Sequence, residues 1–155
     1  MKKSKIFLIF LALAAMSLMA CVKEDGQLPT PYELVNNTLD LTMKVKEGSL
    51  SSEGLTLIFE NTTDVEAIYS EFFALEKKTD KEWYQVPVIV KGDYGFNDIA
   101  YILGPGESQE FKMDWAWLYG SIGPGNYRLV KEVLDFRGTG DYDSYFLAAE
   151  FTITE

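Results

Sequence analysis

The sequence predicts an all-β protein: an antiparallel sandwich of about seven or eight short strands, preceded by a signal peptide and a flexible tether. From residue 39 onward, apolar and polar residues alternate at a period of two, which is the pattern of strands that bury one face. Clusters of Gly, Pro, Asn and Asp separate these runs, and no run has the period of an amphipathic helix. Short strands joined by turns therefore account for the chain.

The leader at the N-terminus differs from the rest of the chain. Three lysines lie among the first five residues, and an apolar run over residues 6–19 follows with one serine in it. A positive start and a short apolar run are typical of a secretory signal peptide. The run is shorter than the roughly 20 residues that a membrane-spanning helix needs. We therefore expect export, with residues 1–20 as the signal peptide.

The leader ends in a motif for lipid attachment. Leu18-Met19-Ala20-Cys21 resembles a bacterial lipobox, and Cys21 is the only cysteine in the chain. No intrachain disulfide can form, and acylation would explain the lone thiol. One acyl chain binds a membrane only marginally, whereas the several chains of a bacterial lipoprotein anchor it durably. We expect a palmitate-type anchor on Cys21 at the outer, extracytoplasmic face of the cell membrane; the alternative is a free secreted protein.

The mature chain is strongly acidic. Removal of the leader takes three of the 14 basic residues and none of the 24 acidic ones, which leaves a net charge of −13. Such a charge repels phosphate backbones and anionic lipid headgroups, so we expect no nucleic-acid partner and a domain that stands away from the membrane surface. Acidity also keeps an exported domain soluble.

Residues 21–38 are expected to form a lipidated, flexible tether. They carry Pro29, Pro31 and Asn36 and have little apolar periodicity, which is the composition of a linker. The folded domain is expected over residues 39–155, a length that suits one domain with its own core.

The strands are expected in regular order after the tether. The expected ranges are 39–45, 55–60, 67–77, 83–90, 99–103, 111–115, 126–134 and 145–153. A polar connection at 78–81 predicts a hairpin, and Gly-Pro-Gly triplets at 104–106 and 123–125 mark turns. Residues 114–120 are the exception, because a helical turn can link two strands there.

Five stretches of the sequence share their pattern with a known family. They are Leu55 to Asn61, Tyr69 with Leu75-Glu76-Lys77, Trp83-Tyr84, Trp117 to Gly120, and Gly123 to Lys131. Together they resemble a bacterial immunoglobulin-like domain family, over about residues 40–154. The resemblance implies an immunoglobulin-like β-sandwich in a secreted or lipid-anchored protein, mainly of Gram-positive bacteria, without a defined molecular function.

Trp83, Pro124, Gly125 and Tyr127 form the structural part of this pattern. Pro124 and Gly125 supply a tight bend, and Tyr127 resembles the tyrosine corner of sandwich domains, whose hydroxyl returns to nearby backbone. In antibody domains a cysteine follows two positions later, whereas here the residue is Leu129. Apolar packing must therefore hold the two sheets together.

Most catalytic chemistries are excluded by composition. The chain contains no histidine, and Cys21 is assigned to lipid, so Ser-His, Cys-His and the usual zinc arrangements cannot be built. We expect a non-catalytic protein without a cofactor. The remaining enzymatic alternative is a carboxylate-based hydrolase, for which the sequence singles out no pair of acidic residues.

Three aspartates around the turn at residues 138–140 are weak candidates for calcium. Asp135, Asp141 and Asp143 offer hard oxygen ligands on a loop. Their spacing matches no known calcium loop, so a solvated hairpin tip is the preferred interpretation, and no metal site is expected.

Three aromatic residues are candidates for a ligand platform. Trp115, Trp117 and Tyr119 lie close together, and exposed rings of this kind stack on sugars or anchor a protein partner. Packing within the fold is the preferred interpretation, because large rings between strands more often cover a core.

The function that these observations favour is presentation at the cell surface. We expect a membrane-anchored, non-catalytic immunoglobulin-like module that presents loops or a sheet face to an envelope protein or polysaccharide. This expectation rests on architecture, which hosts many functions. A carbohydrate-binding accessory module that uses the aromatic cluster is the first alternative, and the hydrolase is the second.

Overall fold

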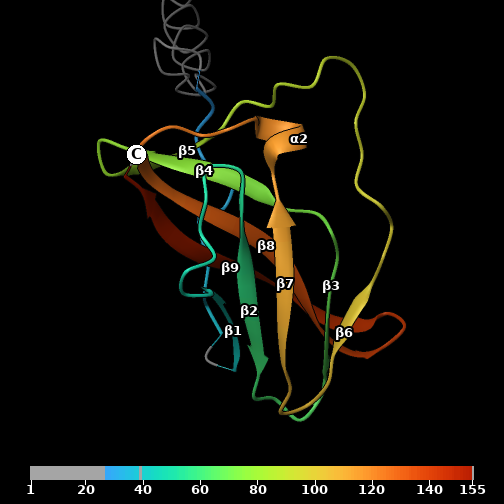
Figure 1. Cartoon of the computed structure of the whole chain (residues 1–155). Coiled ribbons are helices and arrows are strands. Elements are labelled where there is room, and N and C mark those ends of the chain that lie inside the picture. Colours follow the sequence, from blue (N-terminus) through green and yellow to red (C-terminus); the bar gives the residue numbers. More distant parts are fainter. Residues whose placement is uncertain (1–26, 39, 155) are drawn as a thin grey trace, which may run out of the picture.

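The computed structural model describes residues 27–38 and 40–154. The signal peptide, Cys21 and residue 39 lie outside the described residues. Figure 1 shows two β-sheets packed against each other, with one short helical turn at the end of the domain where the described chain begins. The antiparallel β-sandwich predicted from the sequence is confirmed.

Nine strands and one helix make up the described fold. They are β1 (Leu41–Val45), β2 (Gly54–Asn61), β3 (Glu66–Tyr69), β4 (Ala74–Thr79), β5 (Glu82–Gln85), β6 (Tyr101–Leu103), β7 (Ser108–Asp114), α2 (Ala116–Tyr119), β8 (Gly125–Gly138) and β9 (Asp141–Ile153). The smaller sheet has the order β1-β2-β7. The larger sheet has the order β5-β4-β8-β3-β6, with β9 also paired to β8.

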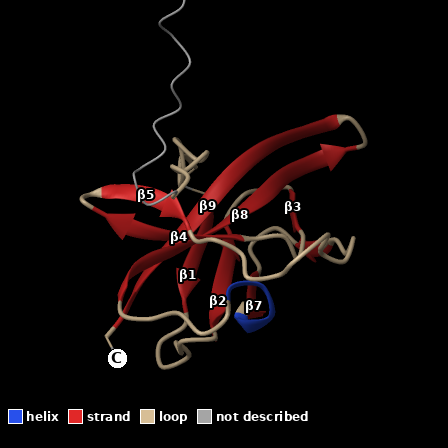
Figure 2. Ribbon diagram, turned by 90° about the horizontal axis from the view of Figure 1, so that it is seen from above, coloured by secondary structure: helices blue, strands red, loops and turns tan. Residues whose placement is uncertain are grey.

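Strand β8 organises the larger sheet. Along one of its edges, β4 pairs with residues 127–130 and β3 with residues 133–136, while β9 pairs with β8 from Gly125 to Gly138. The β8–β9 hairpin extends beyond the rest of the sheet, as the view from above shows (Figure 2). Both strands are longer than the sequence predicted, because the polar residues near the hairpin tip pair with each other without burying a face.

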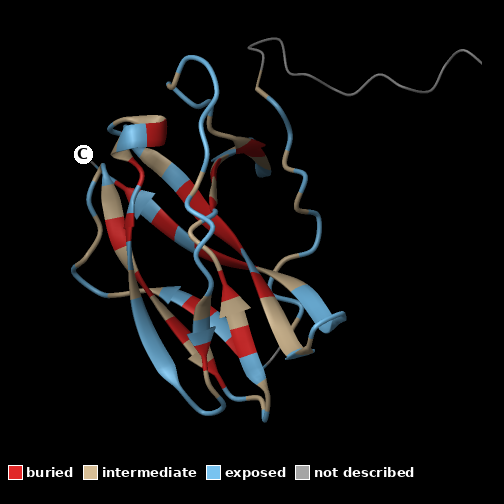
Figure 3. Cartoon of the chain, turned by 90° about the vertical axis from the view of Figure 1, so that its right-hand side faces the viewer, coloured by how far each residue is buried: buried red, intermediate tan, exposed pale blue. Residues whose placement is uncertain are grey.

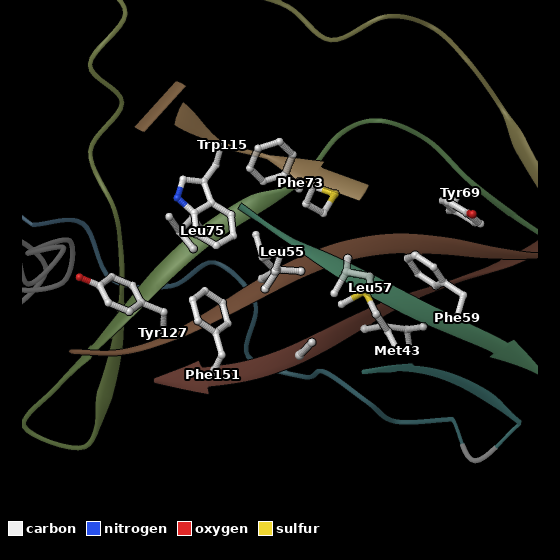
Figure 4. Close-up of a cluster of buried hydrophobic side chains, with 14 of the residues drawn as sticks. Met43, Leu55, Leu57, Phe59, Tyr69, Phe73, Leu75, Trp115, Tyr127 and Phe151 are labelled. Atoms are coloured by element: carbon white, nitrogen blue, oxygen red, sulfur yellow. The ribbon is translucent and has the colours of Figure 1, made fainter. Parts of the chain in front are cut away.

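The core lies between the two sheets, and aromatic rings bridge it. Buried and exposed residues alternate along the strands (Figure 3), and the buried set includes side chains of both sheets (Figure 4). Phe151 stacks on Trp115 at 5.5 Å and on Tyr127 at 5.8 Å between ring centroids. The Tyr127 hydroxyl donates to the Gly123 carbonyl at 2.9 Å, as a tyrosine corner requires. Stacked rings thus help to join the two layers, as expected for a sandwich without the inter-sheet disulfide of antibody domains.

The prediction of a single strand over residues 67–77 is wrong. The chain leaves the sheet at residues 70–73, which separate β3 from β4. Lys131 is the cause. Its side chain is fully buried, and its ammonium group donates to the carbonyls of Ser70 at 2.6 Å and Phe72 at 2.8 Å. A buried cation needs such acceptors, and a bulge that turns two carbonyls inward supplies them. We call residues 70–73 the bulge.

The strand expected over residues 83–90 is also shorter than predicted, because regular pairing ends at Gln85. Pro87 has no N–H to donate to a sheet ladder. Residues 86–100 instead form a long loop, and α2 confirms the helical turn expected within residues 114–120.

The tether is shorter than the sequence predicted. Residues 28–36, which we call the strap, lie on the outer face of the larger sheet. At one edge, Pro29 forms a β-bridge with Tyr84. The Thr30 amide also donates to the Trp83 carbonyl at 3.0 Å. The strap therefore begins as an addition to the β5 edge.

At the opposite edge of the sheet, the strap pairs with β9. The Asn36 amide donates to the Phe146 carbonyl at 2.8 Å. The Asn36 side chain donates to the Ala148 carbonyl at 3.0 Å and accepts from the Ala148 amide at 2.8 Å. These contacts use main-chain groups and one amide side chain. They require no alternation of apolar and polar residues, so the sequence pattern does not indicate them.

Between the two edges, the strap crosses a buried ion pair. Arg128 is 5% exposed and Glu76 is fully buried, and the guanidinium contacts the carboxylate at 2.7 Å. The same guanidinium donates to the Thr30 hydroxyl at 3.1 Å and to the Tyr32 carbonyl at 3.3 Å, and it lies 4.6 Å from the Trp83 ring centroid. The strap thus completes the hydrogen bonding of a cation that is removed from water.

Stability is expected to depend on pH through Lys131. Burial lowers the pKa of this amine from 10.5 to about 7, and the Glu71 carboxylate opposes the shift. The unfolded chain keeps the proton up to about pH 10.5, whereas the folded protein releases it above about pH 7. The unfolded state therefore binds more protons between these values, and the free energy of unfolding rises with pH across that window.

Urea unfolding followed by circular dichroism at pH 7 and pH 9 measures this rise, which Lys131→Met should abolish. The comparison is clean because the chain has no histidine. An equal rise in the variant would show that another group is responsible.

Candidate functional site

One end of the sandwich gathers aromatic side chains, three of which are exposed. The loop of residues 86–100 lies next to the bulge and α2 at this end, where Figure 1 shows the strap entering the fold. We call this the aromatic end; its rings are Phe72, Phe73, Tyr94, Phe96, Trp117 and Tyr119.

Phe96 holds the loop in place. Its ring makes edge contacts with Phe72 at 5.3 Å, Phe73 at 5.4 Å and Trp117 at 5.5 Å between centroids. Tyr94 lies beside Trp117 at 6.5 Å. Edge-to-face pairs of this kind add to the stability that burial provides, so a loop without regular structure is fixed by its aromatic residues.

A groove of about 430 Å³ opens on one side of Phe96. The strap, the bulge, the loop and α2 all contribute to it, and its walls are mostly apolar. A second groove of about 370 Å³ lies on the other side, where Trp117 is joined by Asn97, Lys112 and Asp114. Concave apolar surfaces with few polar groups are the usual form of a contact site.

The edge of these grooves is unusually apolar. Six of the ten exposed large hydrophobic side chains in the described residues lie at these grooves or next to them. Ile89 lies beside α2, where its amide donates to the Leu118 carbonyl. The other five line the grooves, and we call the six residues the rim: Leu28, Phe72, Val88, Ile89, Tyr94 and Trp117. Their exposed fractions run from 38% for Val88 to 60% for Ile89. Clustered exposure of this kind marks an interaction surface, whereas scattered exposed apolar residues do not.

Of the three rings that the sequence offers as a candidate platform, Trp115 packs inside the fold, as the preferred interpretation expects, and only Trp117 belongs to the rim. Trp115 is fully buried, and its indole N–H donates to the Ser52 carbonyl at 2.9 Å. Tyr119 is half-buried, and burial raises the pKa of its hydroxyl. Trp117 is 44% exposed. The turn of α2 separates the rings, whereas a strand would have placed all three on one face.

Sequence reasoning missed the remaining rings of the aromatic end. Phe72 and Phe73 were assigned to a continuous strand. Tyr94 and Phe96 lie in a stretch rich in Gly and Asp, without the alternation of a strand. Two aromatic residues in such a loop were the signal that could have indicated a surface site.

The weak calcium candidates at the hairpin tip, Asp135, Asp141 and Asp143, contact a side chain of the chain itself. Arg137 lies between the three carboxylates, at 3.4 Å from Asp135 and 3.0 Å from both Asp141 and Asp143. Hydrogen bonds to Asp141 and Asp143 raise the pKa of the guanidinium. The chain's own cation thus takes the place of a metal, and no cluster within the described ranges is suited to hold one.

Glu71, a carboxylate that lines the second groove, has structural contacts. Glu71 accepts a hydrogen bond from Asn97 at 2.7 Å on one oxygen and from the Tyr101 hydroxyl at 3.1 Å on the other. Both oxygens therefore fix the loop and β6 to the bulge, which gives the hydrolase alternative no support.

Among the described residues, no helix has the length and apolar character to cross a membrane.

The two neighbouring tryptophans should respond differently to truncation. Trp115→Ala is expected to lower the free energy of unfolding by about 3–5 kcal/mol, because it opens a cavity in the core. Trp117→Ala is expected to cost about 1 kcal/mol or less, because its ring lies at the surface. Urea titration followed by circular dichroism measures both. Equal losses would contradict the placement of Trp117 in the rim.

Comparison with known proteins places the domain in a family. None of the curated proteins matches the chain in sequence. Among solved structures, the ASH/PapD-like domain 7 of human CEP192 is similar at 10% identity and a TM-score of 0.38, over 81% of this chain and 97% of that one. The family model described as bacterial Ig-like domain matches residues 36–152. The chain belongs to this bacterial Ig-like domain family.

Proposed function

We propose that the protein is an exported lipoprotein, acylated on Cys21, that works at the outer face of the cell membrane as a non-catalytic contact module. The leader of residues 1–20 and the lone cysteine support export and anchoring. An envelope protein or polysaccharide is the proposed partner of the displayed domain.

The observation that carries the contact role is the rim. A folded domain gains stability by burying large apolar side chains, yet this one leaves six of them exposed around two grooves. Domains of the immunoglobulin-like architecture commonly serve as interaction modules, and an uncovered apolar surface is what such a module uses.

The same residues argue against catalysis. A reaction needs groups that hold or move protons at a site, and this chain lacks histidine. At the aromatic end, Glu71 is already hydrogen-bonded to Asn97 and Tyr101, and Asp114 accepts a hydrogen bond from the Ala116 amide. The rim itself offers apolar contact area, which binds without chemistry.

Acylation of Cys21 is directly measurable. In its host, the protein should incorporate an alkyne analogue of palmitate, and the mature N-terminal peptide should carry the added acyl mass on Cys21. Cys21→Ser should lose the label and leave the membrane fraction, while a Ser17→Ala control in the leader keeps both. A mature protein that begins at Met1, or that carries a free thiol at Cys21, would refute the anchor.

A further inference from the structure

We propose that the rim docks on the outer leaflet of the membrane that holds the anchor, so that the aromatic end faces the lipid. The proposal rests on acylation of Cys21 and narrows the contact role of the rim to one occupant: the interfacial region of a bilayer, in place of an envelope protein or polysaccharide. It follows from where the described chain begins, from the chemistry of the rim and from the local charge.

The length of chain between the anchor and the rim sets the distance. Leu28, a member of the rim, follows Cys21 by seven residues. Whatever conformation these residues adopt, they span at most about 25 Å at roughly 3.6 Å per residue. The aromatic end therefore lies closer to the acyl chains than any part of the domain beyond it, because the strap is fixed to the sheet from Leu28 onward.

The rim has the side chains that prefer a membrane interface. Tryptophan and tyrosine combine an apolar ring with a polar group, and they are enriched where headgroups meet acyl chains. Trp117 and Tyr94 supply these rings, and the aliphatic side chains of Ile89, Val88 and Leu28 supply apolar area beside them. Surface-bound proteins insert this combination to a shallow depth.

The net charge of the mature chain predicts a domain that stands away from the membrane. The short chain between Cys21 and Leu28 opposes this repulsion, because it keeps the aromatic end close to the bilayer. On the exposed part of the loop, Lys91 offsets Asp93. Lys112 lies with Glu71 and Asp114 in the second groove, and Asp98 is a further acidic neighbour of the aromatic end. Repulsion between these groups and a surface is screened within about 8 Å at physiological salt. An anchored domain also meets the bilayer at a millimolar-scale effective concentration, so a weak affinity is sufficient.

Docking would orient the domain. The β8–β9 hairpin projects obliquely from the side of the domain, away from the entry of the strap (Figures 1 and 2). With the rim on the lipid, the hairpin and its Arg137 cluster are directed away from the membrane. This is the surface that remains free for an envelope partner.

The test uses the chain from Cys21 onward, which contains every contact described here. Its one thiol is coupled to a maleimide lipid in phosphatidylcholine vesicles, with or without bromine on the acyl chains. Bromine quenches tryptophans that reach the bilayer, and subtracting the spectrum of Trp117→Phe isolates the signal of Trp117. Chemical coupling replaces acylation by the cell, so failure of docking and failure of the Cys21 anchor are separate results.

We expect brominated vesicles to remove most of the Trp117 signal, and less of it when the vesicles carry anionic lipid. Ile89→Ser should weaken the quenching several-fold. The matched control is Ile102→Ser, which alters an equally exposed isoleucine on β6 and should leave quenching unchanged. No quenching of Trp117, or equal effects of both substitutions, would overturn the proposal. A shift of unquenched Trp117 emission caused by wall polysaccharide or by a second copy of the chain would assign the rim to that occupant instead.

Discussion

The hydrogen bonds of the Arg128 guanidinium are the interactions on which the position of the strap on the domain depends. It is buried on the outer face of the larger sheet, where it pairs with Glu76 and binds the strap through Thr30 and Tyr32. A buried cation without these partners costs several kcal/mol, so the sheet and the strap need each other. The ion pair therefore decides where the chain enters the domain, and thereby which end of the domain lies next to a lipid anchor.

A second buried cation on the same strand completes the aromatic end. Arg128 faces outward from β8 and fixes the strap, which carries Leu28. Three residues further along, Lys131 faces the core and fixes the bulge, which carries Phe72. Two opposite faces of one strand thus position two members of the rim. The position of the contact surface therefore follows from the hydrogen bonds that these two β8 cations make with the strap and the bulge.

Much of the fold could be predicted from the sequence, because the alternation of apolar and polar residues along a strand indicates which of its faces is buried. The sandwich, the hairpins, the tyrosine corner and the helical turn followed from local patterns. The strap could not be found this way, since main-chain pairing at sheet edges has no side-chain period. The break at the bulge had a signal that was overlooked: Lys131 occupies an inward position between Leu129 and Val133. Of Trp115, Trp117 and Tyr119, only Trp117 is exposed. The sequence could not show this, because it does not reveal where the helical turn α2 begins, and the starting residue decides which side chains face the core.

The central claim is that the strap is part of the folded domain and is held by the Arg128–Glu76 pair. Hydrogen exchange followed by NMR tests it at the amides of Thr30 and Asn36, which donate to the larger sheet. The account predicts that both are protected at least about tenfold over a free peptide. It also predicts that the charge-free double variant Arg128→Met, Glu76→Leu loses this protection while the β8–β9 ladder keeps its own. Exchange of both amides at free-peptide rates in the unaltered protein would contradict the account.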